Sequence, residues 1–169
     1  MFRIKLIKSK NPKRIPKILR RRARPIKKIT PAIKKLAFKM GEIMTKENGL
    51  GLAAPQVGKS IQLFVIKNGD ENIAVINPRL VATSLETEIL EEGCLSFPNW
   101  WAKIERPKKI KISGLNLEGK KIELEGEGYA GRALLHEIDH LNGILFFDHI
   151  KPPYKLEQKN RKTALVFHR

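Results

Sequence analysis

The sequence has a single cysteine, no long apolar run and, in its first 41 residues, no acidic residue. One cysteine, Cys94, excludes a framework of disulfides within the chain. No uninterrupted apolar run is long enough to span a bilayer, and Arg3 and Lys5 interrupt the first residues too early for the apolar part of a signal peptide. These absences favour a cytoplasmic protein.

The missing acidic residues make the charge distribution uneven. Residues 1–41 hold 16 of the 34 basic residues and none of the 17 acidic ones, whereas the rest of the chain holds 18 basic and 17 acidic residues. Such an excess favours contact with RNA, the ribosome or an anionic membrane surface. A solvated arm without a partner is the plain alternative. An organellar transit segment is another, because the stretch is rich in arginine and free of acid, although it is poor in serine.

A length of 169 residues suits one domain with a sizeable core. Thr30 and Pro31 read as an N-cap and first turn of a helix that ends near Asn48, and methionines on its apolar stripe are expected to pack. Strands are expected at residues 61–66, 73–76, 85–90, 101–105, 109–117 and 121–125, with Asn77-Pro78 ending the second. A helix is expected over residues 128–147 and a short polar helix or tail after residue 151. This order predicts an α+β fold with mostly antiparallel sheets around that second helix.

The second helix carries His136-Glu137-Ile138-Asp139-His140. Residues four apart lie on one helix face, so the two imidazoles can aim at one point. This is the H-E-x-x-H pattern of metallohydrolases, in which the glutamate moves protons and binds no metal. The alternative is an ordinary amphipathic helix with two half-buried histidines.

A catalytic metal site usually has three protein ligands and an open position for water. Cys94 is the preferred third ligand, because a thiolate suits a soft divalent metal. As a lone cysteine it could also be a buried small residue or a nucleophile. His149 and His168 are the other candidates, but neither has an ordered, glycine-flanked context.

Residues 49–58 contain three glycines, small alanines and Gln56. Glycines in this number indicate backbone that turns tightly or approaches another group closely. The pattern does not favour a phosphate-binding loop, because it lacks the Gly-Lys-Ser/Thr ending and the preceding strand of such loops. Gln56 is therefore a candidate functional amide in an apolar loop.

Three blocks of the sequence resemble, in order, those of one family. Residues 49–56 resemble the G-x-G-x-A-A-x-Q block of the peptide deformylases, residues 92–98 resemble their E-G-C-L-S block, and residues 136–140 resemble their H-E-x-D-H block. The resemblance runs from about residue 15 to residue 150. It implies a basic N-terminal arm at residues 1–14, a catalytic domain at residues 15–150 and a short tail or helix at residues 151–169.

The resemblance implies hydrolytic removal of the formyl group from the N-terminal formyl-methionine of nascent polypeptides. Cys94, His136 and His140 would bind one divalent metal ion, Fe2+ in the cell, with Zn2+, Ni2+ or Co2+ possible in purified protein. Glu137 would be the general base and acid. The charge of the basic arm, and not the resemblance, makes a contact with RNA or the ribosome one interpretation of that segment, level with a solvated arm.

Other positions of the resemblance concern the substrate. Gln56 and the backbone N–H of Leu95 would face the oxyanion. Leu50, Leu90 and Leu95 are candidate walls of the methionine pocket, although for Leu90 a place in the core is an equal alternative. Arg106 would lie near the substrate peptide, or would be a surface charge on a strand. The implied substrate-binding residues are Gly49, Leu50, Gly51, Leu90, Gly93 and Arg106.

Two departures from the family's pattern stand out. Leu135 replaces the usual glutamine before the first histidine, which predicts altered local hydrogen bonding without loss of activity. The basic arm is longer than usual and the tail is short, so ribosome docking through a C-terminal segment is not carried over. The rival functions are a general metalloprotease and a non-catalytic RNA-binding relative.

Overall fold

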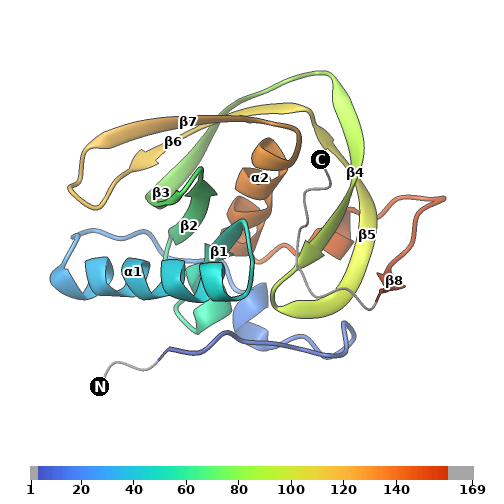
Figure 1. Cartoon of the computed structure of the whole chain (residues 1–169), viewed down its shortest axis with the longest axis horizontal. Coiled ribbons are helices and arrows are strands. Elements are labelled where there is room, and N and C mark those ends of the chain that lie inside the picture. The colour runs from blue at the N-terminus through green and yellow to red at the C-terminus, as the bar shows by residue number, and fades with distance from the viewer. Residues whose placement is uncertain (1–3, 160–169) are drawn as a thin grey trace.

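The computed structural model describes residues 4–159 and has an α+β fold, as the sequence predicts. Figure 1 shows α2 at the centre, with the strands of one sheet on one side and the β4–β5 ribbon on the other. The helices are α1 (Pro31–Lys46) and α2 (Gly128–Asn142), with short 3-10 helices η1 (Lys17–Arg20), η2 (Ala54–Val57) and η3 (Phe146–His149). The strands are β1 (Gly51–Ala53), β2 (Leu63–Asn68), β3 (Glu71–Thr83), β4 (Thr87–Cys94), β5 (Phe97–Pro107), β6 (Lys109–Leu115), β7 (Lys121–Glu127) and β8 (Glu157–Gln158).

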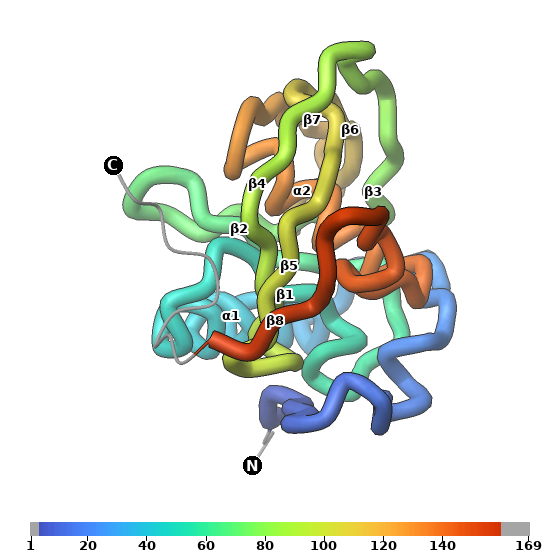
Figure 2. Tube along the Cα trace, turned by 90° about the vertical axis from the view of Figure 1, so that its right-hand side faces the viewer, coloured from blue at the N-terminus to red at the C-terminus, as the bar shows by residue number. Residues whose placement is uncertain are grey.

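The strands form two sheets in which all neighbours pair antiparallel. One sheet has the order β1-β2-β3-β6-β7 and the other the order β4-β5-β8. Ala133, Leu134 and Leu141 of α2 pack against the five-stranded sheet in one core cluster. The long β4–β5 ribbon crosses α2 on its other side (Figure 2). The helix that carries the histidines is therefore enclosed by both sheets.

Helix α1 begins and ends as its sequence predicts. The Thr30 hydroxyl accepts a hydrogen bond from the Ile33 N–H at 3.4 Å, and Pro31 occupies the first turn. Met40 and Met44 are fully buried in the core. Their role is packing, as expected.

The β2–β3 hairpin confirms the expected strand pair, but its second strand does not end at Asn77-Pro78. Strand β3 continues to Thr83 through a register shift between Ile76 and Arg79. Asn77 takes a φ of 50° and its side chain bonds both the N–H and the carbonyl of Ile26 at 2.8 Å. A bulge of this kind lets a strand accommodate a proline that would otherwise interrupt it.

The N-terminal segment packs against the rest of the protein over its described residues. Ile4 and Leu6 contact the core cluster of α1 and the first sheet. The Ile7 N–H donates to the Gln56 carbonyl and the Ser9 N–H to the Ser96 carbonyl, both at 2.8 Å. The expected boundary at residue 14 stays a prediction, but residues 4–14 are not a detached arm.

Helix α2 is shorter than the expected span of residues 128–147. It ends at Asn142 because Gly143 adopts a left-handed φ of 75°, a common way to end a helix. After η3 the chain forms the two-residue strand β8, and no helix follows within the described residues. The rest of the expected tail, residues 160–169, lies outside the described residues.

The glycine-rich segment also contains a strand, β1, that the sequence does not predict. Its three residues pair with β2 at the edge of the larger sheet. Between residues 4 and 159, no helix has the length and apolarity needed to cross a membrane.

Candidate metal centre

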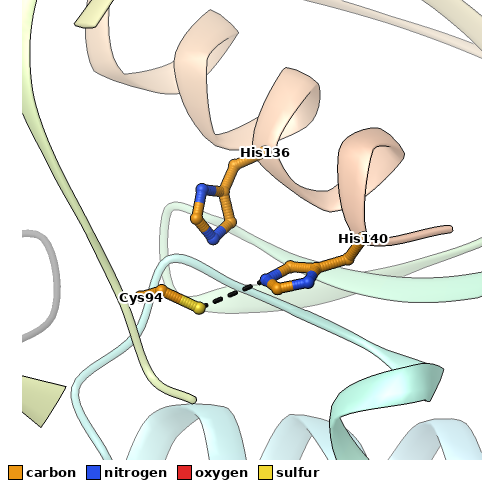
Figure 3. Close-up of side chains that lie close together, drawn as sticks. All are labelled: Cys94, His136 and His140. Carbon is orange, nitrogen blue, oxygen red and sulfur yellow. Dashed lines mark hydrogen bonds between the residues drawn. The ribbon is translucent and has the colours of Figure 1, made fainter. Parts of the chain in front are cut away.

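Cys94, His136 and His140 converge in the interior, although the cysteine precedes the histidines by 42 or more positions along the chain. One ligand atom from each lies within 4.8 Å of the others, and all three side chains are buried. The Cys94 Sγ and His140 Nε2 are 3.2 Å apart. Figure 3 shows the three side chains pointing toward one another from the end of β4 and from one face of α2.

Local backbone structure explains this convergence. Cys94 is the last residue of β4, where a register shift precedes the tight turn into β5. His136 and His140 are one helical turn apart, and their ring centroids are 4.8 Å apart. Burial lowers the pKa of His140 well below its usual value, which keeps the ring neutral, as a metal ligand must be.

His136 is oriented by a buried carboxylate. Its Nδ1 lies 2.7 Å from Glu92 Oε1, and because a carboxylate only accepts, Nδ1 carries the proton and Nε2 is left as the ligand atom. Burial opposes a positive charge on this ring, but Cys94 and Glu92 outweigh it and raise the pKa of His136. Burial also opposes ionisation of Glu92, yet His136 and Arg106 hold the pKa of Glu92 well below its usual value.

Glu92 is a functional residue that sequence reasoning did not single out. It is fully buried and also accepts from Arg132 Nη1 at 3.2 Å. Its place two residues before Cys94 was the available signal, because residues i and i+2 of a strand share a face. The two arginines that neutralise Glu92 come from β5 and α2, which the sequence alone does not bring together.

Arg106 is buried, so its reading as a surface strand charge is wrong. Its Nε and Nη2 lie 3.1 and 2.7 Å from the Glu92 carboxylate, and its Nη1 lies 2.6 Å from Asp139 Oδ2. Carboxylates thus engage every nitrogen of the guanidinium. This geometry favours a role in holding Glu92 over the expected contact with the substrate peptide.

Glu137 lies beside the cluster with a carboxylate oxygen that has no partner. The side chain is 2% exposed, and within the described residues its Oε2 makes no hydrogen bond. Burial raises the pKa of Glu137 to about 8. A Cβ on Gly51 would lie 2.4 Å from Glu137 Oε1, so only glycine leaves room for this carboxylate. A buried acid with an unmatched oxygen, directly after the candidate ligand His136 on α2, fits a catalytic cation and its water.

Gln56 faces the same interior. Its Oε1 accepts from the Ala53 N–H at 2.8 Å, while its Nε2 donates to Ser96 Oγ at 3.2 Å and approaches Cys94 Sγ at 3.5 Å. Leu95 follows Cys94 in the turn and is buried. The amide expected at the site therefore lies against the cysteine.

Comparison with known proteins identifies the same family as the sequence blocks described above. The sequence model of the family described as Polypeptide deformylase matches residues 6–156. A peptide deformylase of Thermotoga neapolitana is 48% identical over 144 residues, covering 85% of this chain and 88% of the relative. The chain belongs to the peptide deformylase family. The crystal structure of peptide deformylase from Thermotoga maritima superposes with a TM-score of 0.81 at 44% identity and covers 90% of this chain and 100% of that one. The deformylase of Synechococcus elongatus, solved with actinonin, also has a TM-score of 0.81, at 33% identity, over 89% of this chain and 80% of its own.

Membership in the family establishes the activity. The enzyme removes the N-formyl group from nascent polypeptides in a metal-dependent hydrolysis. Cys94, His136 and His140 form a group that could hold a metal ion. The family match begins within the expected arm, at residue 6.

The expected substrate residues occupy different places around the deformylase site. Gly49 and Gly93 are close to side chains, since a Cβ would lie 2.7 Å from Leu95 Cδ1 and 2.9 Å from the Trp101 ring, respectively. Leu90 is half-buried and pairs with Ile104 across the β4–β5 ribbon. Of the three leucines, only Leu50 lines a cavity of about 440 Å³ between β2, β7 and α2.

Leu135 packs against the core cluster of α2, where the family's usual glutamine would place an amide. His149 is not part of the metal-binding group and lies 2.8 Å from Asp139. His168 lies outside the described residues.

Proposed function

We propose that Cys94, His136 and His140 hold one divalent cation and that Glu137 is the general base and acid of the deformylation. The observation that carries this proposal is the convergence of three ligand atoms within 4.8 Å beside a buried carboxylate. When bound, the cation supplies Lewis-acid activation of water and of the formyl carbonyl. The open position required for this follows from a set of three protein ligands.

Glu137 moves the proton. Its unpartnered Oε2 is the atom that can accept a proton from the attacking water and return it to the leaving amine. A positioned acid or base of this kind contributes about 10²- to 10⁴-fold to the rate. Gly51 sets the position of this carboxylate, because any larger residue would overlap it.

Gln56 and the backbone N–H of Leu95 are proposed to bind the oxyanion. The Ala53 N–H fixes the Gln56 amide through Oε1, which leaves the Nε2 hydrogens as donors. The hydrogen directed at Cys94 makes only a long contact of 3.5 Å with the sulfur, so it is available to a substrate oxygen. Loss of one such donor costs about 3 to 4 kcal/mol of transition-state stabilisation.

The cavity beside Leu50 is proposed to receive the methionine side chain. Its walls include Ala133, which lies one helical turn before Glu137 on α2, and Leu50 itself precedes Gly51. The cavity is lined mainly by apolar groups and is large enough for an unbranched thioether chain. Leu90 and Leu95 would then contact other parts of the substrate or serve only in packing.

Fe2+ is the proposed metal in the cell, following the family resemblance. One thiolate and two imidazoles also suit Zn2+, Co2+ and Ni2+, so purified protein can carry any of these. Elemental analysis of protein purified without oxygen, paired with the assay below, identifies the metal that supports turnover.

Formate release from formyl-Met-Ala-Ser tests the proposed function. The metal-loaded enzyme is expected to release formate and to leave the peptide bonds intact. Cleavage between the residues of the peptide would favour the general metalloprotease instead. Absence of both reactions in metal-loaded protein would overturn the assignment of catalytic roles.

We propose that the basic N-terminal segment, residues 1–41, contacts RNA, and that in the cell this RNA belongs to the ribosome. Several of its basic side chains, including those of Arg22 and Arg24, have no carboxylate within ion-pair distance among residues 4–159. The backbone that carries these side chains is held in place. The Ala23 N–H donates to the Leu141 carbonyl at 2.8 Å, and Arg24 forms a bridge with Ile61. A cavity of about 620 Å³ next to this segment is lined by Arg22, Arg24 and Arg79 and by no acidic residue. Arginines held in this way suit the phosphates of a nucleic acid.

Fluorescence anisotropy with a labelled single-stranded RNA tests this contact. Replacing Arg22, Arg24 and Arg79 by glutamine should lower the slope of log K against log salt by about 2, since each phosphate contact contributes roughly 0.7. A matched variant with Lys5, Lys13 and Arg14 replaced keeps the cavity. Equal losses in the two variants would assign binding to the whole segment, and salt-independent or absent binding by the unaltered protein would contradict an RNA contact.

The cytoplasm is the proposed compartment, where nascent formylated chains emerge. Fractionation of cells that express the full chain tests this, and recovery of a shortened protein from an organelle would support the alternative of a transit segment.

A further inference from the structure

A chain of hydrogen bonds connects His136 to a histidine at the protein surface. From the ligand ring outward it passes through Glu92 at 2.7 Å, Arg106 at 2.7 Å, Asp139 at 2.6 Å and His149 at 2.8 Å. Side-chain exposure rises along the chain from 0% at Glu92 through 5% and 13% to 35% at His149. His149 is thus the only member of this chain with substantial access to solvent.

The chain ties together segments that are remote in the sequence. His149 belongs to η3, Asp139 and His136 to α2, Arg106 to β5, and Glu92 to β4. The Asp139 carboxylate can only accept hydrogen bonds, so His149 Nε2 donates to Oδ2, the same oxygen that receives Arg106 Nη1. Asp139 is therefore held from two sides. His149 Nε2 also lies 3.4 Å from Arg106 Nη1, but with its proton directed at Asp139 this nitrogen cannot accept from the guanidinium, so Asp139 is the bonded link between the two side chains.

Arg106 is placed by a balance between two carboxylates. Its Nε and Nη2 engage Glu92 while Nη1 engages Asp139. If His149 is removed, Asp139 loses its outer donor and becomes free to rotate toward solvent, and Arg106 loses its fixed anchor. The hydrogen bonds of Arg106 to Glu92 then have a less defined geometry. The orientation of the His136 ring, which Glu92 sets, becomes less defined as well.

We propose that His149 is a positioning residue for the metal centre, acting on His136 through Asp139, Arg106 and Glu92. Partners that contact a ligand histidine directly change metal affinity by about 10- to 100-fold. His149 is three residues further out than such a partner. Its removal is expected to weaken metal binding by about 3- to 10-fold.

Metal affinity and the spectrum of the Co2+ protein are the readouts, because neither depends on turnover. Metal-depleted protein is titrated with Zn2+ against a chelator of known affinity, and the visible absorption bands are recorded after loading with Co2+. His149→Ala should bind Zn2+ more weakly and shift the Co2+ bands. His149→Gln, whose amide can still donate to Asp139, should restore both. Unchanged affinity and bands in His149→Ala would overturn the proposal.

Arg20→Gln, in η1, is the matched control because it removes another contact of η3. Arg20 pairs with Asp148 of η3 and lies over the Phe147 ring, so its loss loosens η3 without removing the His149 contact. This variant should melt at a lower temperature and keep the unaltered metal affinity. An equal loss of affinity in Arg20→Gln would show that His149 only anchors η3, and would overturn the proposal.

A double-mutant cycle tests the route. In an Asp139→Ala background, which removes the oxygen that both His149 and Arg106 contact, His149→Ala should cause no further loss of metal affinity, since the chain is already cut. A full additional loss would contradict transmission through Asp139. If His149→Ala does not fold, His149→Asn replaces it in these experiments, because its shorter amide does not reach Asp139. This variant should likewise bind Zn2+ more weakly and shift the Co2+ bands. Failure of the unaltered protein to bind one Zn2+ would instead reject the metal centre itself.

Discussion

Gly51→Ala is predicted to disable the catalytic base without removing the metal. A Cβ at this position would lie 2.4 Å from Glu137 Oε1 and 2.7 Å from its Cδ and Cγ. Non-bonded carbon contacts are favourable near 3.5 to 4.0 Å, so the carboxylate must move by about 1 Å. A misplacement of about 1 Å costs on the order of 10²-fold in rate. We expect kcat to fall by about this factor.

The assay couples formate release from formyl-Met-Ala-Ser to a formate dehydrogenase, with metal content measured on the same sample. Gly114→Ala is the control, because its Cβ would lie 2.6 Å from Val75 Cγ1 in the sheet. It should lower the unfolding free energy by about 1 to 3 kcal/mol and leave kcat of the folded enzyme unchanged. A Gly51→Ala enzyme with full metal content and nearly unaltered kcat would refute the reasoning. Loss of the metal in this variant would refute it too, because the helix would then have moved.

Other changes test the remaining parts of the site. Glu137→Gln should keep the metal and lower kcat by about 10²- to 10⁴-fold, so a fully active variant would remove Glu137 from proton transfer. Cys94→Ser should lose metal on dialysis against a chelator, and unchanged metal content would show that the sulfur is not a ligand. Deleting residues 1–14 should lower the unfolding free energy by about 2 to 4 kcal/mol, because it removes the contacts of Ile7 and Ser9 with the backbone of Gln56 and Ser96. An unchanged melting temperature of the shortened protein would contradict that role.

Short-range patterns predicted much of the fold. The Thr30 cap and the apolar stripe placed α1 correctly, and turn residues placed the β2–β3 hairpin. The sequence pattern gave a wrong strand end where a side chain bonds a segment that is remote in the sequence. Asn77 resembles a strand end in the sequence, but its contacts with Ile26 allow β3 to continue.

The metal centre shows the same division. The spacing of His136 and His140 is a property of one helix, so the sequence predicts that they share a face. Their meeting with Cys94 depends on how β4 crosses α2. Ligand chemistry made Cys94 the preferred third ligand, and the family resemblance supported that choice, but no pattern within one segment shows that the residues meet. The sequence did not single out Glu92 as the residue that orients His136. A carboxylate is stable in the interior only when it is paired, and the pairing of Glu92 with Arg106 and Arg132 depends on the tertiary fold.

The N-terminal segment shows how charge can conceal packing. Its prolines and basic residues are typical of a solvated arm, and those side chains are indeed mostly exposed. Its apolar residues nevertheless pack on the core, and its backbone bonds the loops that carry Gln56 and Ser96. Composition predicts which side chains of such a segment are exposed, but it does not predict which of its residues pack on the core.

Titration of metal-depleted enzyme with Fe2+ in the absence of oxygen tests the central claim most directly. Deformylase activity should rise in proportion to added metal and stop rising at one equivalent per chain, and the protein with Cys94, His136 and His140 all replaced should neither bind the ion nor turn over. Activity without metal, or stoichiometric binding that survives replacement of all three residues, would contradict the account.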